Sequence, residues 1–270
     1  MNAGKDNEKV VVVMPAFNAQ KTLRQTYEDL PADIVSSVIL VDDGSKDDTV
    51  SIAKDLGLTV FVHNRNYGYG ANQKTCYLEA LKADATIIVM VHPDYQYDPR
   101  LLPEMIRPLQ EGKADVVLGS RMAGISAYRQ GMPWWKYIAN RCLTWVENKA
   151  FGLSLSEYHT GYRAYLRNVL ERVDFVMNSD AFVFDQEIIA QIVEAKFRIA
   201  EIPVPVRYFP EASSAGFIDS VYYGLQVVWL VFRYLLHKHG VWRQRRFDSL
   251  ASRYKPVEVS PSTETSKQVK

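Results

Sequence analysis

The sequence predicts an α/β protein with a mostly parallel central sheet and helices on both faces. Three observations support this class. Short apolar runs rich in β-branched residues recur along the first 120 residues, amphipathic stretches separate them, and unusual polar residues follow directly after the runs. Apolar strands that alternate with helices are typical of a parallel sheet covered on both sides.

The first strand illustrates the signal, because Val10–Met14 is a β-branched run closed by Pro15. The strands predicted in this half are Val10–Met14, Val38–Val41, Leu58–Val62, Thr86–Val91 and Asp115–Gly119. The helices predicted between them, from apolar residues at helical spacing, are Ala19–Leu30, Asp47–Leu56, Ala71–Lys82 and Leu101–Glu111.

The second half is less regular. Its predicted elements are a Trp-rich helix Pro133–Phe151, a turn around Gly161, a helix Ala181–Ala195, an edge strand Ile199–Val206 and a long helix Phe217–Lys238. The two prolines of the strand favour a sheet edge. We expect one main domain over residues 10–215, an apolar and basic helical segment over 216–255, and disorder in residues 1–9 and 256–270.

Composition excludes several classes of protein. The 270 residues are 47% hydrophobic, which rules out global disorder, and the net charge of +1 argues against a nucleic-acid-coating protein. Two cysteines, Cys76 and Cys142, are too few for a disulfide framework and favour a reducing, cytoplasmic location. We find no signal peptide and no apolar run long enough to span a membrane.

Polar segments follow the predicted strands at the sheet edge where ligands bind in parallel sheets. They read PAFN (15–18), DDGS (42–45), HNRNYGYG (63–70), HPDYQYD (92–98) and GSR (119–121). This clustering predicts a site there. The carboxylates of Asp42 and Asp43 suit sugar or base groups, although Asp and Ser are also common helix caps.

The segment after the fourth strand places an imidazole, a carboxylate and an amide at alternating positions, His92, Asp94 and Gln96. In an extended chain these side chains point the same way. Oxygen ligands suit Mg²⁺ or Mn²⁺, and a histidine tolerates Mn²⁺. The alternative is a proline turn in which Asp98 caps the next helix.

Three arginines at element ends, Arg121, Arg163 and Arg207, are either surface residues or phosphate contacts made through the guanidinium fork. Asp185 and Glu187 begin a predicted helix. There they either complement the helix dipole or support the site.

Together, the runs VVVMPAFNA, VILVDDGSKDDT, VHPDYQYDP, VVLGSR, HTGYRAY and FVFDQEIIAQ resemble the inverting family 2 glycosyltransferases of GT-A fold. Within that family the chain looks most like the branch of dolichyl-phosphate mannose synthases and polyprenyl-phosphate glucosyltransferases. The resemblance covers residues ~10–215 in the family's order.

The resemblance implies roles for matching positions. Residues implied for the nucleotide sugar are Pro15, Ala16, Asn18, Asp42, Asp43, Ser45 and Arg121. Asp94 and Gln96 match the family's DxDxQ metal motif, in which His92 replaces the first Asp. Residues implied for the acceptor or its phosphate are Arg163, Arg207 and Ser213, with Ala215 at a position where the branch often has Lys.

The resemblance further implies transfer of a hexose from a UDP- or GDP-sugar, with Mg²⁺ or Mn²⁺, to a polyprenyl phosphate. A lipid phosphate is already ionised at pH 7, whereas a hydroxyl acceptor needs a base, for which Glu157 or Asp185 are the candidates beside Asp94. Alternatives are a transferase for hydroxyl acceptors and, because of His92, a catalytically weak sugar-nucleotide binder.

The C-terminal helix suggests a membrane surface as a partner. Its apolar core is too short to span a bilayer, and residues 236–255 add six basic residues against one acidic. Such a helix suits the anionic cytoplasmic leaflet as a peripheral anchor, with Pro133–Phe151 as a second candidate. The alternatives are a helix packed on the domain or a homo-oligomer interface.

Overall fold

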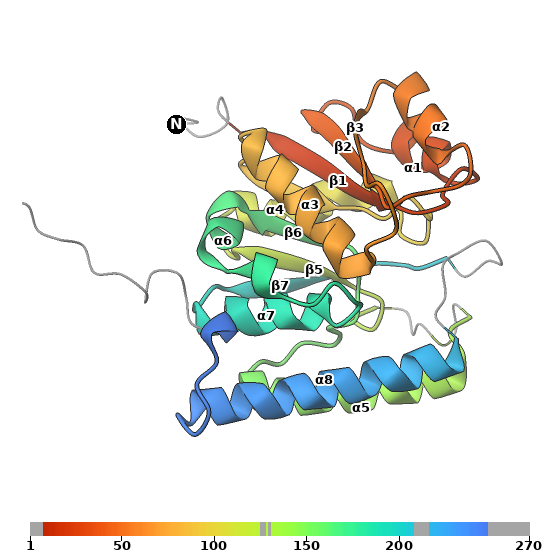
Figure 1. Cartoon of the computed structure of the whole chain (residues 1–270). Coiled ribbons are helices and arrows are strands. Elements are labelled where there is room, and N and C mark those ends of the chain that lie inside the picture. Colours follow the sequence, from red (N-terminus) through yellow and green to blue (C-terminus); the bar gives the residue numbers. More distant parts are fainter. Residues whose placement is uncertain (1–7, 125–127, 129–130, 208–215, 248–270) are drawn as a thin grey trace, which may run out of the picture.

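The computed structural model describes residues 8–124, 128, 131–207 and 216–247, and its centre is a seven-stranded sheet (Figure 1). The strand order is β3-β2-β1-β4-β6-β5-β7. The strands are β1 (Val10–Ala16), β2 (Ser37–Asp42), β3 (Thr59–Val62), β4 (Ile87–Met90), β5 (Val116–Ser120), β6 (Arg163–Leu166) and β7 (Ile199–Pro203). Only β6 runs antiparallel to its neighbours, so the predicted mostly parallel sheet is confirmed, as is the edge position of β7.

Helices cover both faces of the sheet. They are α1 (Leu23–Glu28), α2 (Thr49–Asp55), α3 (Tyr69–Lys82), α4 (Leu102–Gln110), α5 (Trp134–Phe151), α6 (Arg167–Arg172), α7 (Phe184–Glu194) and α8 (Phe217–Lys238), with 3-10 turns at Pro99–Leu101, Phe175–Met177 and Arg245–Phe247. Alternate side chains of β1 enter two different cores, Val11 and Val13 on one face and Val12 and Met14 on the other. This double burial explains why β1 is an uninterrupted apolar run.

Strand β6 is the main difference from the predicted topology, because the sequence predicted only a turn around Gly161. The four residues of β6 insert between β4 and β5, pairing Arg163 with both Met90 and Leu118. A buried arginine interrupts the apolar pattern that identifies a strand. Helix α6, which follows directly, was not predicted either.

Helix α1 is shorter than the predicted Ala19–Leu30. The backbone N–H groups of residues 18–20 donate to side chains of Ser45, Asp47 and Thr49, in the loop after β2 and at the start of α2; Ala19, for example, donates to Thr49 Oγ1 at 2.8 Å. These bonds hold the end of β1 against the loop after β2 and delay the helix start to Leu23. The polar turns of the first two strands are thereby joined into one wall.

Helices α5 and α8 lie side by side as an outer layer, and α7 lies between them and the sheet (Figure 1). One side of α8 is buried, with Leu230 and Tyr234 in the main core. The opposite side exposes an apolar stripe at helical spacing, made of Ile218, Val221, Tyr222, Leu225, Val228, Trp229 and Phe232. Among the described residues, no helix is long and apolar enough to cross a membrane.

Candidate functional site

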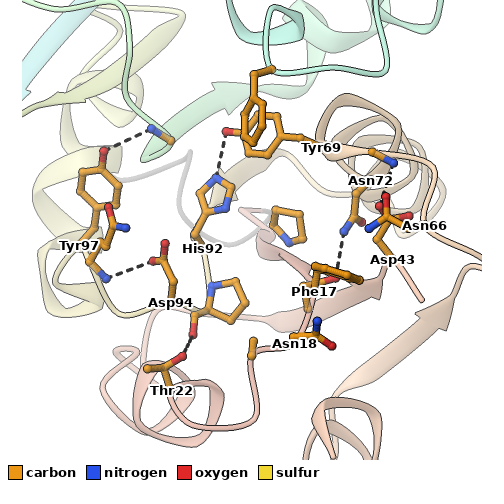
Figure 2. A pocket seen from close by; sticks show the side chains of 18 of the residues that line it. Phe17, Asn18, Thr22, Asp43, Asn66, Tyr69, Asn72, His92, Asp94 and Tyr97 are labelled. Atoms are coloured by element: carbon orange, nitrogen blue, oxygen red, sulfur yellow. Dashed lines mark hydrogen bonds between the residues drawn. The ribbon is translucent and has the colours of Figure 1, made fainter. Parts of the chain in front are cut away.

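Residues that end or follow β1, β2, β4 and β5 line a cavity of about 610 Å³ (Figure 2). The predicted site residues in its lining are Pro15, Ala16, Asn18, Asp43, His92, Asp94, Gln96 and Arg121. Those that lie outside the lining are Asp42, Ser45, Glu157, Arg163, Asp185 and Arg207. Ser213 lies within residues 208–215, which are outside the described part of the structure. Residues 1–7 and 248–270 are outside it as well. Figure 2 shows His92 and Asp94 toward one side of the cavity and Asp43 and Asn72 toward the other.

The two aspartates after β2 have different positions. Asp42 is buried, and its Oδ2 accepts the backbone N–H groups of Gly44 and Ser45 at 3.1 and 2.9 Å. Asp42 therefore stabilises its own turn, which allows Ser45 to hold Asn18. Gly44 has φ +77°, and a Cβ there would lie 2.9 Å from the backbone of Arg65, so glycine is required.

Asp43 joins the end of β2 to the loop before α3. Its Oδ1 lies 2.7 Å from His63 Nδ1 and accepts the N–H of Tyr67, while Oδ2 accepts the N–H of Gly68 at 2.9 Å. Both oxygens of the Asp43 carboxylate therefore already have hydrogen-bond partners within the protein. Sequence reasoning missed His63, although it is the first residue of the polar segment after the third strand.

The segment after β4 forms a turn instead of the extended chain that we considered. Tyr95 adopts φ 58°, and Asp94 Oδ1 accepts the N–H of Gln96 at 3.1 Å. His92, Asp94 and Gln96 nevertheless all line the cavity. The alternative interpretation of Asp98 holds as well, because its carboxylate caps the turn Pro99–Leu101.

Burial acts on both titratable groups of this segment. It lowers the pKa of His92, so the imidazole is neutral at pH 7, and it raises the pKa of Asp94, an effect that nearby His92 opposes. No lysine or arginine of the described chain pairs with Asp94. A partly buried carboxylate that faces a cavity without a cationic partner among the described residues fits a site for a cation.

The donor set also fits a cation shared with a substrate. In the described part of the chain, no group of three His, Cys, Asp or Glu side chains is placed to hold a metal. Mg²⁺ and Mn²⁺ at diphosphates commonly take one or two carboxylates from the protein and the rest of their ligands from phosphate and water. Asp94, Gln96 and His92 suit such a partial shell.

Glu157 lies behind Arg121. This fully buried carboxylate accepts the Arg121 backbone N–H at 2.7 Å, the Nε–H at 2.9 Å, and Asn140 Nδ2 at 2.8 Å. Arg121 also donates through Nη2 to the carbonyl of His159. The arrangement fixes the arginine at the cavity wall and engages both oxygens of Glu157, which leaves the carboxylate poorly placed to act as a base.

Asp185 and Arg163 form a second buried group. Asp185 accepts the Tyr69 hydroxyl at 2.8 Å and Gln73 Nε2 at 3.1 Å, and lies 3.4 Å from Arg163 Nη1. The guanidinium of Arg163 is fully buried and donates to three backbone carbonyls, those of Thr160, Tyr158 and Asp185. Arg163 thus holds the turn before β6 to α7 and does not reach the cavity.

Arg207 lies at the far side of the turn after β4. Its Nη2 donates to Asp98 at 3.0 Å, and its guanidinium stacks 4.3 Å from the centre of the Tyr95 ring. This position supports the turn that carries Asp94.

Two further residues of the lining, Tyr69 and His159, were not predicted. Tyr69 is the first residue of α3 and belongs to the polar segment 63–70 that follows the third predicted strand, and that segment was the available signal. His159 Nε2 lies 3.1 Å from Glu147 of α5, and its Nδ1 lies 2.8 Å from the Tyr223 hydroxyl of α8. The cavity wall is therefore tied to both outer helices.

Comparison with known proteins identifies the fold and the family. The model of "Glycosyl transferase family 2" matches residues 11–174. A UDP-N-acetylglucosamine–dolichyl-phosphate N-acetylglucosaminyltransferase of Methanococcus voltae is 23% identical over 248 residues, covering 86% of this chain and 96% of the relative. A polyprenol monophosphomannose synthase of Mycolicibacterium smegmatis is 24% identical over 211 residues, covering 74% and 78%.

Among solved structures, glucosyl-3-phosphoglycerate synthase from Mycobacterium tuberculosis superimposes with a TM-score of 0.66 at 19% identity, over 88% of this chain and 82% of that one. This likeness concerns the GT-A fold. The family match spans more than half of the chain and includes β1, β2, β4 and β5, whose ends form the cavity. The chain therefore belongs to glycosyl transferase family 2 and is a nucleotide-sugar-dependent glycosyltransferase.

Proposed function

We propose that this glycosyltransferase transfers a hexose from a UDP- or GDP-sugar to a polyprenyl phosphate, with inversion and with a divalent cation. One observation supports the choice of acceptor: in the described chain, each carboxylate that lines the cavity is either bonded to protein groups or assigned to the cation. Asp43 is saturated, Asp180 pairs with Lys74 at 2.7 Å, and Asp94 is the residue best placed for the cation. No carboxylate there is available as a base, and a phosphate acceptor needs none.

The two relatives support the class of acceptor, because one name includes dolichyl phosphate and the other describes a synthase of polyprenol monophosphomannose. One structure of the glucosyl-3-phosphoglycerate synthase contains Mn²⁺ and UDP, which supports a divalent cation and a nucleotide in this fold. The choice between UDP and GDP, and between Mg²⁺ and Mn²⁺, is part of the proposal.

We assign the nucleoside to the wall formed by residues 15–18, Asp43 and Asn72. Asn72 is buried, donates to the Ala16 carbonyl at 3.2 Å, and has an Oδ1 without a partner among the described residues. A buried, unpaired acceptor on a residue of the cavity wall suits an N–H of a base that binds there. The diphosphate then lies toward Asp94, where a bound cation would neutralise its charge, and Arg121 adds a second positive group.

The reaction needs one displacement. An ionised oxygen of the acceptor phosphate attacks the anomeric carbon, the bond from that carbon to the diphosphate oxygen breaks, and the diphosphate keeps the electron pair. Arg121, which Glu157 holds rigidly, is positioned before the reaction and so stabilises the developing charge without reorganisation.

We further propose that the exposed stripe of α8 rests on an anionic membrane surface, at the cytoplasmic face. Trp134, Ile138 and Trp145 of the neighbouring helix α5 are also exposed, and the basic residues Arg243 and Arg245 follow α8. Apolar area together with basic charge is the combination that holds peripheral proteins on anionic leaflets.

The proposal is tested by incubating the protein with UDP- and GDP-hexoses, Mn²⁺ or Mg²⁺, and a polyprenyl phosphate in anionic vesicles. We expect a glycolipid with one donor and inverted anomeric configuration. Absence of glycolipid with every donor, while soluble saccharides are glycosylated, would contradict the acceptor assignment.

That second outcome is the other candidate function, transfer to a hydroxyl acceptor. The observation in its favour is His92, since its Nδ1 forms no hydrogen bond with the described residues and could accept a proton. His92→Gln would then abolish transfer to the hydroxyl without changing cation affinity.

A further inference from the structure

His92 stands where the resemblance implies a carboxylate, and its surroundings assign it a specific chemical state. Its Nε2 lies 3.3 Å from the hydroxyl of Tyr69, and the two rings are stacked with an angle of 3° between their planes (Figure 2). The same edge of the imidazole faces Gly161, where a Cβ would lie 2.6 Å from Nε2. The opposite edge, which carries Nδ1, therefore faces away from Tyr69 and Gly161.

The direction of the hydrogen bonds follows from Asp185. This carboxylate is surrounded by donors, namely the Tyr69 hydroxyl at 2.8 Å, Gln73 Nε2 at 3.1 Å and the Arg163 guanidinium at 3.4 Å. Asp185 is thus an acceptor, and Tyr69 gives it the hydroxyl proton. The Tyr69 oxygen then offers a lone pair to His92, so Nε2 carries the hydrogen and Nδ1 keeps its lone pair.

This arrangement is the one that prepares a histidine for a metal. Histidine ligands generally donate their second ring N–H to a neighbouring acceptor, which fixes the tautomer and makes the ligating nitrogen more basic. Here Tyr69 and Asp185 provide that acceptor from α3 and α7, while Gly161 leaves room for the ring. Asp94, two residues along the same turn, lines the same cavity.

We propose that Tyr69 and Asp185 hold His92 as the Nε2–H tautomer so that Nδ1 ligates the cation of the nucleotide diphosphate, which makes the site prefer Mn²⁺ to Mg²⁺. Mg²⁺ is hard and strongly favours oxygen ligands, whereas Mn²⁺ accepts an imidazole nitrogen more readily. The inference rests on the proposed function, from which it takes the cation and the diphosphate, and it assigns Tyr69 and Asp185 as positioning residues.

The test needs no sugar transfer. Pulsed electron paramagnetic resonance of Mn²⁺ bound with UDP, and in parallel with GDP, detects a directly coordinated ¹⁴N nucleus. We expect this coupling in the wild type and its loss in His92→Gln. Titration calorimetry with each nucleotide should give about tenfold weaker Mn²⁺ binding in Tyr69→Phe. His92→Asp should reduce the preference for Mn²⁺ over Mg²⁺ by a similar factor.

Tyr67→Phe is the matched control, because the Tyr67 hydroxyl binds Asn64 at 2.9 Å and not His92. It should leave the spectrum and the affinities unchanged. A wild-type spectrum without nitrogen coupling, or one that persists in His92→Gln, would overturn the ligand assignment. Tyr69→Phe with wild-type Mn²⁺ affinity would overturn the positioning role.

The outcomes separate this inference from the proposed function. Nitrogen coupling without any glycolipid product would support His92 as a cation ligand and contradict the proposed transfer to a polyprenyl phosphate. Glycolipid formation by an enzyme without nitrogen coupling does the reverse.

Discussion

At the scale of single residues, Asp94 is the carboxylate on which the proposed cation site depends. Asp94→Asn keeps the shape of the turn and removes the charge. Because a bound cation contributes several kcal/mol to stabilising a phosphate leaving group, we expect transfer to fall by about 100-fold or more. Initial rates at saturating donor measure this loss.

Asp33→Asn, at an exposed turn position, is the matched control and should keep full activity. Unchanged rates in Asp94→Asn would refute the assignment of this carboxylate to the cation.

Arg121 and Glu157 make a second residue-scale prediction, this time for stability. Arg121→Ala leaves the fully buried Glu157 carboxylate without its cation, which should reduce the free energy of unfolding by about 3–5 kcal/mol. Denaturant titration measures the change. Arg198→Ala, which removes a cation whose side chain is 57% exposed from its pair with Asp115, should cost less, about 1 kcal/mol.

Adding Glu157→Gln to Arg121→Ala should recover much of the loss, since the unpaired charge is then gone. If the double variant is as unstable as Arg121→Ala alone, the buried charge is not the cause.

At the scale of elements, two glycines should respond to alanine in opposite directions. Gly70, in the first turn of α3, has the Ser179 carbonyl well inside van der Waals distance of a built Cβ, so Gly70→Ala should destabilise by about 1–3 kcal/mol. Gly224 of α8 has only Leu143 near, at 3.8 Å. Gly224→Ala should stabilise by about 0.5–1 kcal/mol through helix propensity.

Thermal unfolding of both variants checks the signs. Gly70→Ala should also weaken nucleotide binding, because Gly70 packs against the loop 179–182, part of which lines the cavity. Equal stability of the two variants would show that the close approach of α3 to this loop is not needed.

The elements also show what sequence could and could not predict. The β-branched run of β1 and the polar turns after it were predictable, since buried parallel strands leave few alternatives for such patterns. Strand β6 was not predictable, because it has only four residues and one of them is Arg163, which breaks the apolar pattern of a buried strand. The partners of that arginine are Tyr158, Thr160 and Asp185, and the last of these lies more than twenty residues away in the chain.

The same limit applies to the site. Residue types at strand ends predicted Asp43, His92, Asp94 and Arg121 in one cavity. They did not distinguish residues that line the cavity from residues that hold the lining residues in place. Glu157 and Asp185 belong to the second group, since they bind Arg121 and Tyr69, and these contacts become visible only in the folded structure. Tyr69 was missed because its place in the polar segment 63–70 was its only signal, and nothing in the sequence distinguishes it from the neighbouring Tyr67.

At the scale of the whole molecule, we predict that the outer layer of α5 and α8 contacts the membrane through the exposed stripe of α8. The double substitution Leu225→Glu and Phe232→Glu places two charges in the exposed stripe of α8 without touching its buried side. We expect it to abolish flotation with anionic vesicles while the fold is retained, as judged by circular dichroism.

Val62→Glu, at an exposed apolar position on β3, is the control and should float like the wild type. Equal flotation of the α8 variant would refute the stripe as the membrane contact.

The α8 stripe has a kinetic consequence if it holds the molecule on a bilayer. The lipid acceptor then arrives by lateral diffusion in two dimensions, while the water-soluble donor arrives from the bulk. Turnover should follow the mole fraction of acceptor in the membrane and not its total concentration in the suspension. Diluting the acceptor with inert lipid, at constant acceptor per volume of suspension, should slow the enzyme. The reason is that an enzyme held on the bilayer by α8 encounters its acceptor only by diffusion within the membrane surface.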